Sequence, residues 1–252
     1  MCRHLAYTGP ETTVGAVVSA PQHSLFRQSW APRHQRYGTV NADGFGVGWY
    51  AGNDPVPARY RRAVPIWTDG SFIDLARVVR TTALLAAVRD ATLEGADGET
   101  AAAPFASGPW LFSHNGAVPA WPESMAAQAA TLPVVDLLSM EARTDSAFVW
   151  ALVLHRLRSG DEPGQALADT VAAVAEAAPG ARLNLLLTEG TSIVATAWGD
   201  TLWYLTDSER HAVTVASEPY DDDARWSPVP DRTLLTATRT DVLLTPLKEP
   251  ST

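Results

Sequence analysis

The 252-residue chain has a single cysteine and no run approaching the ~18 consecutive apolar residues of a membrane-spanning helix. One cysteine cannot form an intramolecular disulfide. The six histidines are scattered without metal-site spacing, so we expect neither a metal nor a cofactor. Basic residues are few, and 19 Lys and Arg against 28 Asp and Glu give a formal net charge of −9. An acidic surface argues against nucleic acid or an anionic membrane as a partner.

The chain begins MCRHLAYTGP, which lacks the apolar segment of a secretory signal peptide, so we expect a cytoplasmic protein. Hydrophobic residues make up 46% of the sequence and charged residues 19%, which is enough for a sizeable core. The length allows one large domain or two small ones. Since the sequence contains no repeat and no long linker, we expect a single domain over residues 1–252.

Hydrophobic periodicity predicts strands near both ends of the chain and helices between them. Helices are expected over residues 72–79, 144–160 and 163–180. Asp69 or Ser71 would cap the first of these helices, and Thr144 would cap the second. The first ~50 residues are expected to hold only strands and turns. The order strands, helices, strands predicts two sheets with helices packed on their outer faces.

Short β-like runs account for most of the predicted strands. They cover residues 41–50, 81–88, 183–188, 193–198, 202–205 and 212–216, with a further hairpin over 234–247. Glu189-Gly190 and Gly199-Asp200 are typical hairpin turns between the strands that flank them. The small and polar segments 93–105 and 119–133 are expected to be surface loops.

Cys2 follows the initiator methionine directly. A lone cysteine is more often a buried small hydrophobic residue than a nucleophile. Aminopeptidases remove Met1 when the next residue is small, and the thiol would then share its residue with a free α-amine of pKa near ~8. Such an amine can serve as the base that activates the thiol, without a histidine or aspartate partner. Cys2 is therefore a candidate N-terminal nucleophile.

Asn115 and Gly116 end the sequence SHNG, which follows an apolar strand-like run. An Asn-Gly pair after a strand is often only a hairpin turn, and this interpretation stays open. The alternative is an oxyanion hole, in which the Asn115 side-chain amide and the Gly116 backbone N–H face a developing negative charge. Glycine has no Cβ and lets the backbone approach a substrate closely.

Two charged residues could hold the ends of an amino acid. Arg89 closes an apolar strand, where its guanidinium either forms a structural salt bridge or clamps a substrate carboxylate. Asp145 stands in the first turn of a helix, where it either caps the helix or pairs with a substrate ammonium. Together with Cys2 and Asn115, these groups would bind a free amino-acid head and cleave an acyl bond at its far end.

This set of residues resembles the class II glutamine amidotransferases, a branch of the N-terminal-nucleophile hydrolases. That family has a cysteine directly after Met, an Arg followed by Ala/Thr on a strand, an HNG motif and an Asp near a helix start. The resemblance implies catalytic roles for Cys2, Asn115 and Gly116 and substrate contacts from Arg89, Thr92, His114 and Asp145. It also implies an α+β fold, a four-layer αββα sandwich of two mainly antiparallel sheets.

Longer stretches, among them MCRHL, LLAAVRDAT and VASEPYDDDARWSPVPDR, resemble one branch of the family that acts in ergothioneine biosynthesis. This resemblance implies hydrolysis of the γ-glutamyl amide of a small-molecule conjugate and leaves a homodimer open. Asp90 stands where glutaminase domains often have Trp, and Ala103 stands where many have His. These departures predict selectivity beyond glutamine. A glutaminase subunit feeding a separate synthase, and a non-catalytic γ-glutamyl-binding module, remain as alternatives.

Overall fold

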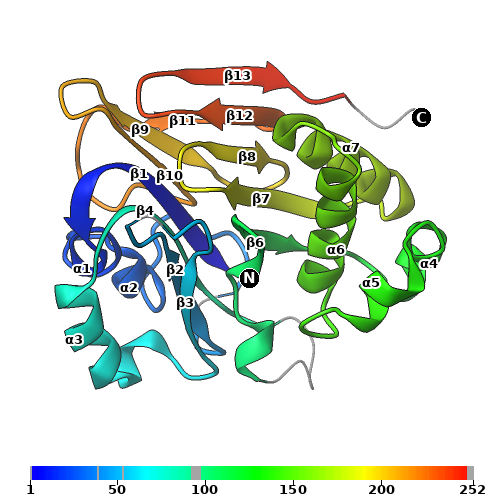
Figure 1. Ribbon diagram of the computed structural model, residues 1–252, viewed down its shortest axis with the longest axis horizontal. Coiled ribbons are helices and arrows are strands. Elements are labelled where there is room, and N and C mark those ends of the chain that lie inside the picture. Colours follow the sequence, from blue (N-terminus) through cyan, green and yellow to red (C-terminus); the bar gives the residue numbers. More distant parts are fainter. Residues whose placement is uncertain (1, 39, 53, 92–97, 249–252) are drawn as a thin grey trace.

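The structure is a computed structural model that describes residues 2–38, 40–52, 54–91 and 98–248. Two sheets of antiparallel strands stack face to face, and helices cover their outer faces (Figure 1). The expected α+β sandwich of two mainly antiparallel sheets, with helices outside, is confirmed.

Within the described residues the first sheet has seven strands, with the N-terminal strand near its middle. In sheet order they are β11 (Ser227–Pro228), β9 (Trp203–Asp207), β10 (Ala212–Ala216), β1 (Arg3–Thr13), β4 (Arg80–Val88), β2 (Phe45–Trp49) and β3 (Ala58–Arg62). Strand β1 pairs with β4 through Arg3↔Val88 and with β10 through Leu5↔Ala216. The residues just before β1, just after β4 and just after β10 therefore meet at one end of the sheet.

The second sheet has six strands in the part of the chain that the structure describes. In sheet order they are β13 (Val242–Pro246), β12 (Thr233–Ala237), β8 (Ile193–Ala197), β7 (Arg182–Thr188), β6 (Trp110–Ala117) and β5 (Phe105–Ser107). Alternation along β1 shows how the two sheets pack, because successive strand residues face opposite sides. Leu5 joins the apolar cluster under the outer helices, whereas Ala6 joins the cluster with Leu111 and Leu186 of the second sheet.

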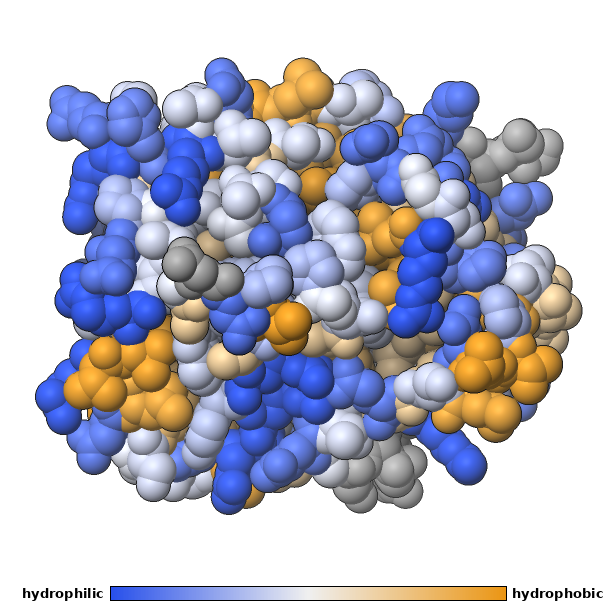
Figure 2. Space-filling model, in the orientation of Figure 1, coloured by the Kyte–Doolittle hydropathy of each residue, from blue (hydrophilic) through white to orange (hydrophobic). Residues whose placement is uncertain are grey.

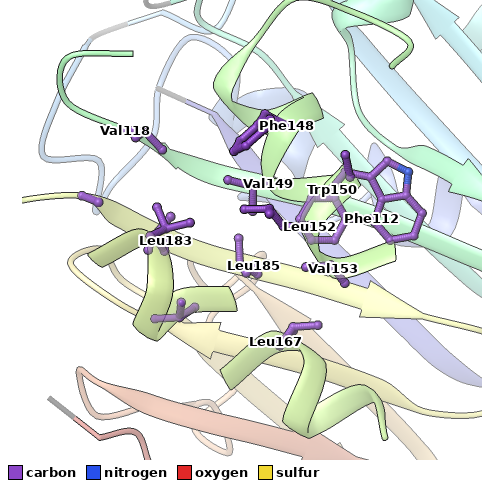
Figure 3. Packing of buried hydrophobic residues seen from close by; sticks show 14 of the residues in the cluster. Phe112, Val118, Phe148, Val149, Trp150, Leu152, Val153, Leu167, Leu183 and Leu185 are labelled. Carbon is purple, nitrogen blue, oxygen red and sulfur yellow. The ribbon is translucent and has the colours of Figure 1, made fainter. Parts of the chain in front are cut away.

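Helices on the two outer faces differ in size. The first sheet is covered by α1 (Val14–Val18), α2 (Leu25–Gln28) and α3 (Gly70–Val78), and the second by α6 (Asp145–Arg158) and α7 (Pro163–Ala177). Figure 3 shows Phe112 of β6 lying against Trp150 of α6, with ring centroids 5.0 Å apart, and Leu185 of β7 in the same cluster. This contact packs α6 against the strand that carries SHNG.

Helix ends follow the signals in the sequence. The Thr144 hydroxyl accepts the Ala147 N–H at 3.1 Å, and the Asp69 carboxylate accepts the Phe72 N–H at 3.0 Å. Asp69, not Ser71, is thus the cap of α3, and the predicted Thr144 cap is confirmed. Side-chain caps of this kind satisfy backbone donors that the first helical turn leaves without a partner.

Several predictions of secondary structure are wrong. The first 50 residues include α1 and α2, and the segment 119–133 contains a 3-10 turn (Glu123–Met125) and α4 (Ala126–Ala129). A short α5 (Val134–Leu138) and strand β3 were not expected. In the segment 93–105, residues 93–97 lie outside the described residues, while the rest forms a 3-10 turn (Glu99–Ala101) and begins β5.

The two predicted hairpin turns have different outcomes. Glu189-Gly190 does join antiparallel neighbours, because β7 pairs with β8. Gly199-Asp200 does not, since β8 belongs to the six-stranded sheet and β9 to the seven-stranded one. The chain crosses between sheets at this point, with Gly199 at φ +86°. A turn signal alone cannot distinguish a hairpin from a crossing between stacked sheets.

The surface is mostly polar. Figure 2 shows hydrophilic side chains over most of the visible face, with apolar side chains gathered in a few separate patches. Among the described residues, no helix combines the length and the apolar character that crossing a membrane requires.

Candidate active site

One pocket collects side chains from both sheets and from the start of α6. It is lined by Cys2, Arg89 and Asp90 from the first sheet, by His114 and Gly116 of β6, and by Thr144, Asp145 and Ser146 at the helix start, along with small and apolar residues. Figure 1 shows the start of β1 approaching β6 and α6. Residues far apart in the sequence thus line one pocket.

Cys2 is half-buried and forms no disulfide. Desolvation raises the pKa of its thiol above the ordinary value. A hydrogen bond with the Asp90 backbone and the positive charge of Arg89 oppose that shift without reversing it. The thiol therefore carries its proton at neutral pH, and a nucleophilic role requires a base beside it.

Arg89 is held by the turn that precedes β2. Its backbone N–H donates to Gly44 O at 2.8 Å, and its carbonyl accepts the Asp43 N–H at 2.9 Å. The guanidinium Nη1 donates to Asp43 O at 3.2 Å, and the Asp43 carboxylate accepts the Ala91 N–H at 2.7 Å. These bonds fix Arg89 where its side chain lines the pocket, next to Cys2 across the β1–β4 register.

Asp145 is the first residue of α6, and each of its oxygens accepts a backbone N–H. Oδ1 accepts from Ser146 at 2.7 Å, and Oδ2 accepts from Val118 at 3.0 Å. The expected capping role at a helix start is therefore present, and a negative charge there is favourable to the helix dipole. A carboxylate has about four lone-pair sites, so these two bonds leave acceptor capacity on Asp145, which lines the pocket.

His114, which lines the pocket, connects three elements. Its Nε2 lies 2.9 Å from Arg182 O of β7, and its Nδ1 lies 3.0 Å from the Ser146 hydroxyl of α6. Because a carbonyl only accepts, Nε2 carries the proton, and in a neutral ring Nδ1 then accepts from Ser146. The ring is buried, and its hydrogen bonds link the strand that carries HNG to the helix that carries Asp145.

The HNG sequence lies within a continuous strand. Strand β6 pairs with β7 through Asn115↔Asn184 and on to Ala117↔Arg182, so the hairpin-turn interpretation is wrong. A Cβ on Gly116 would lie 1.8 Å from Arg182 O, a distance that no side chain can occupy. Glycine is therefore required at this position by packing, whatever further role its N–H has.

Asn115 is completely buried and does not line the pocket. Its Nδ2 lies 3.4 Å from the hydroxyl of Ser217, and its Oδ1 has no hydrogen-bond partner among the described residues. The structure thus brings Cys2, Arg89, Asp145 and the His114–Gly116 strand together, with Asn115 directly beside the lining. Thr92, the remaining predicted site residue, lies outside the described residues.

The model of one protein family, the class II glutamine amidotransferases, matches residues 18–209. The chain belongs to the class II glutamine amidotransferases. The chain is 42% identical over 248 residues to a γ-glutamyl-hercynylcysteine sulfoxide hydrolase of Mycobacterium tuberculosis, covering 98% of this chain and 97% of that protein. It is 41% identical to the hydrolase of the same name from Mycolicibacterium smegmatis, covering 98% and 100% of the two chains.

A solved class II domain protein from Silicibacter pomeroyi, titled a glutamine aminotransferase, matches with a TM-score of 0.71. It is 23% identical and is covered completely, with 98% of this chain aligned, which supports the fold alone. The family expected from Cys2, Arg89, the HNG strand and Asp145 is thereby confirmed. Sequence patterns missed Asp43, Ser146 and Ser217, which act through contacts between distant segments. Ser217 stands in the idiosyncratic VASEPYDDD stretch, which was the one available signal.

Proposed function

We propose that this class II glutamine amidotransferase cleaves the γ-glutamyl amide of γ-glutamyl-hercynylcysteine sulfoxide, giving glutamate and hercynylcysteine sulfoxide in ergothioneine biosynthesis. The 42% identity over nearly the whole chain with a hydrolase named for that substrate carries the proposal. In this proposal residues 1–252 form one domain that acts in the cytoplasm. The pocket with Cys2, Arg89 and Asp145 supports it, because it pairs a thiol with one cationic and one anionic group.

The first acyl transfer begins with Cys2 after removal of Met1. Its α-amine takes the thiol proton. The thiolate attacks the γ-carbonyl carbon, and the carbonyl oxygen becomes an oxyanion. The Asn115 amide and the Gly116 N–H stabilise this charge. The protonated amine then gives its proton to the leaving nitrogen as the C–N bond breaks, which leaves a γ-glutamyl thioester on Cys2.

The second acyl transfer uses the same groups. The α-amine takes a proton from water, and the resulting hydroxide attacks the thioester carbonyl. The oxyanion forms again at the same place and collapses with release of the thiolate, which recovers the proton. Glutamate leaves, and the enzyme returns to its starting state. The thiol and the amine supply both nucleophile and base, so the reaction needs no metal or cofactor.

The glutamyl head is held at its charged end. Arg89 clamps the α-carboxylate and Asp145 binds the α-ammonium. The further substrate contacts proposed for His114 and Thr92 rest on the family resemblance. The geometry supports this assignment because Arg89 and Asp145 line the same pocket as Cys2 from different elements. Fixing the head in this way holds the γ-carbonyl carbon close to the thiol. Binding the substrate then lowers the entropic part of the reaction barrier.

Intact-mass measurement tests the proposed nucleophile. We expect the native protein to lack Met1 and, after rapid quenching during turnover, to show a population heavier by one glutamyl group. Peptide mapping should place that group on Cys2. Retention of Met1 in active protein, or a glutamyl group on another residue, contradicts the mechanism. An unprocessed, inactive protein that still binds glutamate would favour the binding-module alternative.

A further inference from the structure

Ser217 joins the nucleophile strand to the HNG strand. It follows β10 and is completely buried. Its N–H donates to His4 O at 2.9 Å, and its hydroxyl oxygen accepts the His4 N–H at 3.0 Å. Because His4 lies on β1 two residues after Cys2, Ser217 is fixed relative to the nucleophile. Its hydroxyl also faces Asn115 of the other sheet, at 3.4 Å.

The hydrogen bonds of Asn115 are incomplete as the side chain stands. Oδ1 is buried and has no partner among the described residues, and the contact from Nδ2 to Ser217 Oγ exceeds the usual 2.7–3.2 Å. A buried acceptor left without a hydrogen bond costs about 1–3 kcal/mol. An asparagine amide has nearly the same shape after a half-turn that exchanges its oxygen and its nitrogen.

The turned amide gives the Ser217 hydroxyl proton an acceptor and leaves the amide N–H groups for a ligand. The Ser217 hydroxyl already accepts from His4, so its own proton needs an acceptor, and Oδ1 of Asn115 becomes that acceptor. The amide nitrogen then takes the place that Oδ1 occupies now. Both of its N–H groups become available to a ligand oxygen beside Gly116, the next residue on the strand and part of the pocket lining.

We propose that Ser217 is the positioning residue of the oxyanion hole. Its hydroxyl holds Oδ1 of Asn115, so that Nδ2 donates to the oxyanion formed when Cys2 attacks. The inference rests on the proposed function, because it takes Asn115 as the oxyanion donor. The connection Cys2–His4–Ser217–Asn115 sets nucleophile and donor at a fixed separation across two sheets. A donor that is already oriented does not have to reorganise during the reaction.

The test is a double-mutant cycle of Ser217→Ala and Asn115→Ala with γ-glutamyl-hercynylcysteine sulfoxide as substrate. Asn115→Ala should lower kcat by about 10²- to 10³-fold, the loss typical of one oxyanion donor. Ser217→Ala should lower kcat by about tenfold or more while KM and the Kd for glutamate stay within about twofold. In the Asn115→Ala background, Ser217→Ala should change kcat by less than about twofold, because the two residues act as one unit.

Ser113→Ala is the matched control. Ser113 is an equally buried serine on β6, and its hydroxyl contacts His4 Nδ1 at 3.1 Å instead of Asn115. We expect this variant to keep kcat within about twofold of the wild-type value. An equal loss of kcat in the control would show a general effect of removing a buried hydroxyl and would overturn the assignment.

The remaining outcomes separate the inference from the proposed function. Two results overturn the inference alone. In one, the losses of kcat from the two substitutions are additive. In the other, Ser217→Ala leaves kcat unchanged while Asn115→Ala lowers it. A silent Asn115→Ala removes the oxyanion assignment and the inference with it. If Ser217→Ala does not fold, a crystal structure of the wild-type adduct with glutamate γ-semialdehyde decides. We expect Asn115 to contact both the adduct oxygen and Ser217 Oγ, and a missing contact on either side overturns the inference.

Discussion

Replacing Asp145 by asparagine separates the two roles that its place at the start of α6 allows. The side chain keeps its shape, loses its charge and presents an NH2 group in place of one oxygen. Both carboxylate oxygens accept backbone N–H groups, from Ser146 at 2.7 Å and from Val118 at 3.0 Å. An NH2 group cannot accept, so only one of these two bonds survives the change.

The two roles predict losses of different kinds. A hydrogen bond to a charged acceptor is worth about 1.5–3 kcal/mol, which for a chain of this size lowers Tm by roughly 3–12 °C. Removing one partner of a desolvated ion pair with the substrate costs at least about 2 kcal/mol, or roughly 30-fold in kcat/KM. The first loss appears in the free protein, whereas the second requires a ligand with an α-ammonium.

The assay compares two substrates that differ only in that ammonium. For Asp145→Asn we expect the roughly 30-fold loss with the γ-glutamyl substrate and little change with its desamino analogue, which carries a glutaryl group. Melting curves give the stability loss separately. Asp74→Asn is the control, because Asp74 lies exposed on α3 in a surface ion pair with Arg77. Equal losses of kcat/KM with both substrates would show that Asp145 only caps the helix.

Three further outcomes follow from the site. Cys2→Ala should abolish turnover and leave glutamate binding measurable by calorimetry, and residual turnover above trace would exclude the thiol mechanism. Gly116→Ala should unfold or inactivate the protein, because its Cβ would lie 1.8 Å from Arg182 O. The control Gly70→Ala should leave Tm and activity unchanged, because a Cβ there would meet no atom within 4 Å. Rate profiles should show kcat/KM rising with pH up to about 8, because only the unprotonated α-amine can take the thiol proton; a flat profile would contradict an amine base.

Local signals in the sequence were sufficient for much of the fold. Thr144 and Asp69 cap helices because a side-chain oxygen near the first turn satisfies its neighbours' N–H groups, a contact only three residues long. Edge strand β3 was missed because ARYRR has no apolar alternation. The turn at Gly199-Asp200 was misassigned, because the same residues serve a hairpin and a crossing between sheets.

The site residues also divide into those that the sequence could predict and those that it could not. The motifs around Cys2, Arg89 and Asp145 could be found because each combines a reactive group with a recognisable local setting. Ser217 and Asp43 could not, since their effects depend on contacts with residues 102 and 46 positions away. Such contacts exist only after the strands have paired, and no periodicity or turn signal in one segment encodes them.

Substrate preference tests the proposed function most directly. The leaving half of γ-glutamyl-hercynylcysteine sulfoxide offers contacts that ammonia cannot, and binding remote parts of a substrate can lower the barrier at the reacting bond. Asp90 and Ala103, which both line the pocket, depart from the glutaminase pattern. On one enzyme preparation, we expect kcat/KM for this conjugate to exceed that for glutamine by at least about 10²-fold, near 2.7 kcal/mol. Equal values, or a preference for glutamine, would contradict the proposed function and favour a glutaminase that feeds a separate synthase.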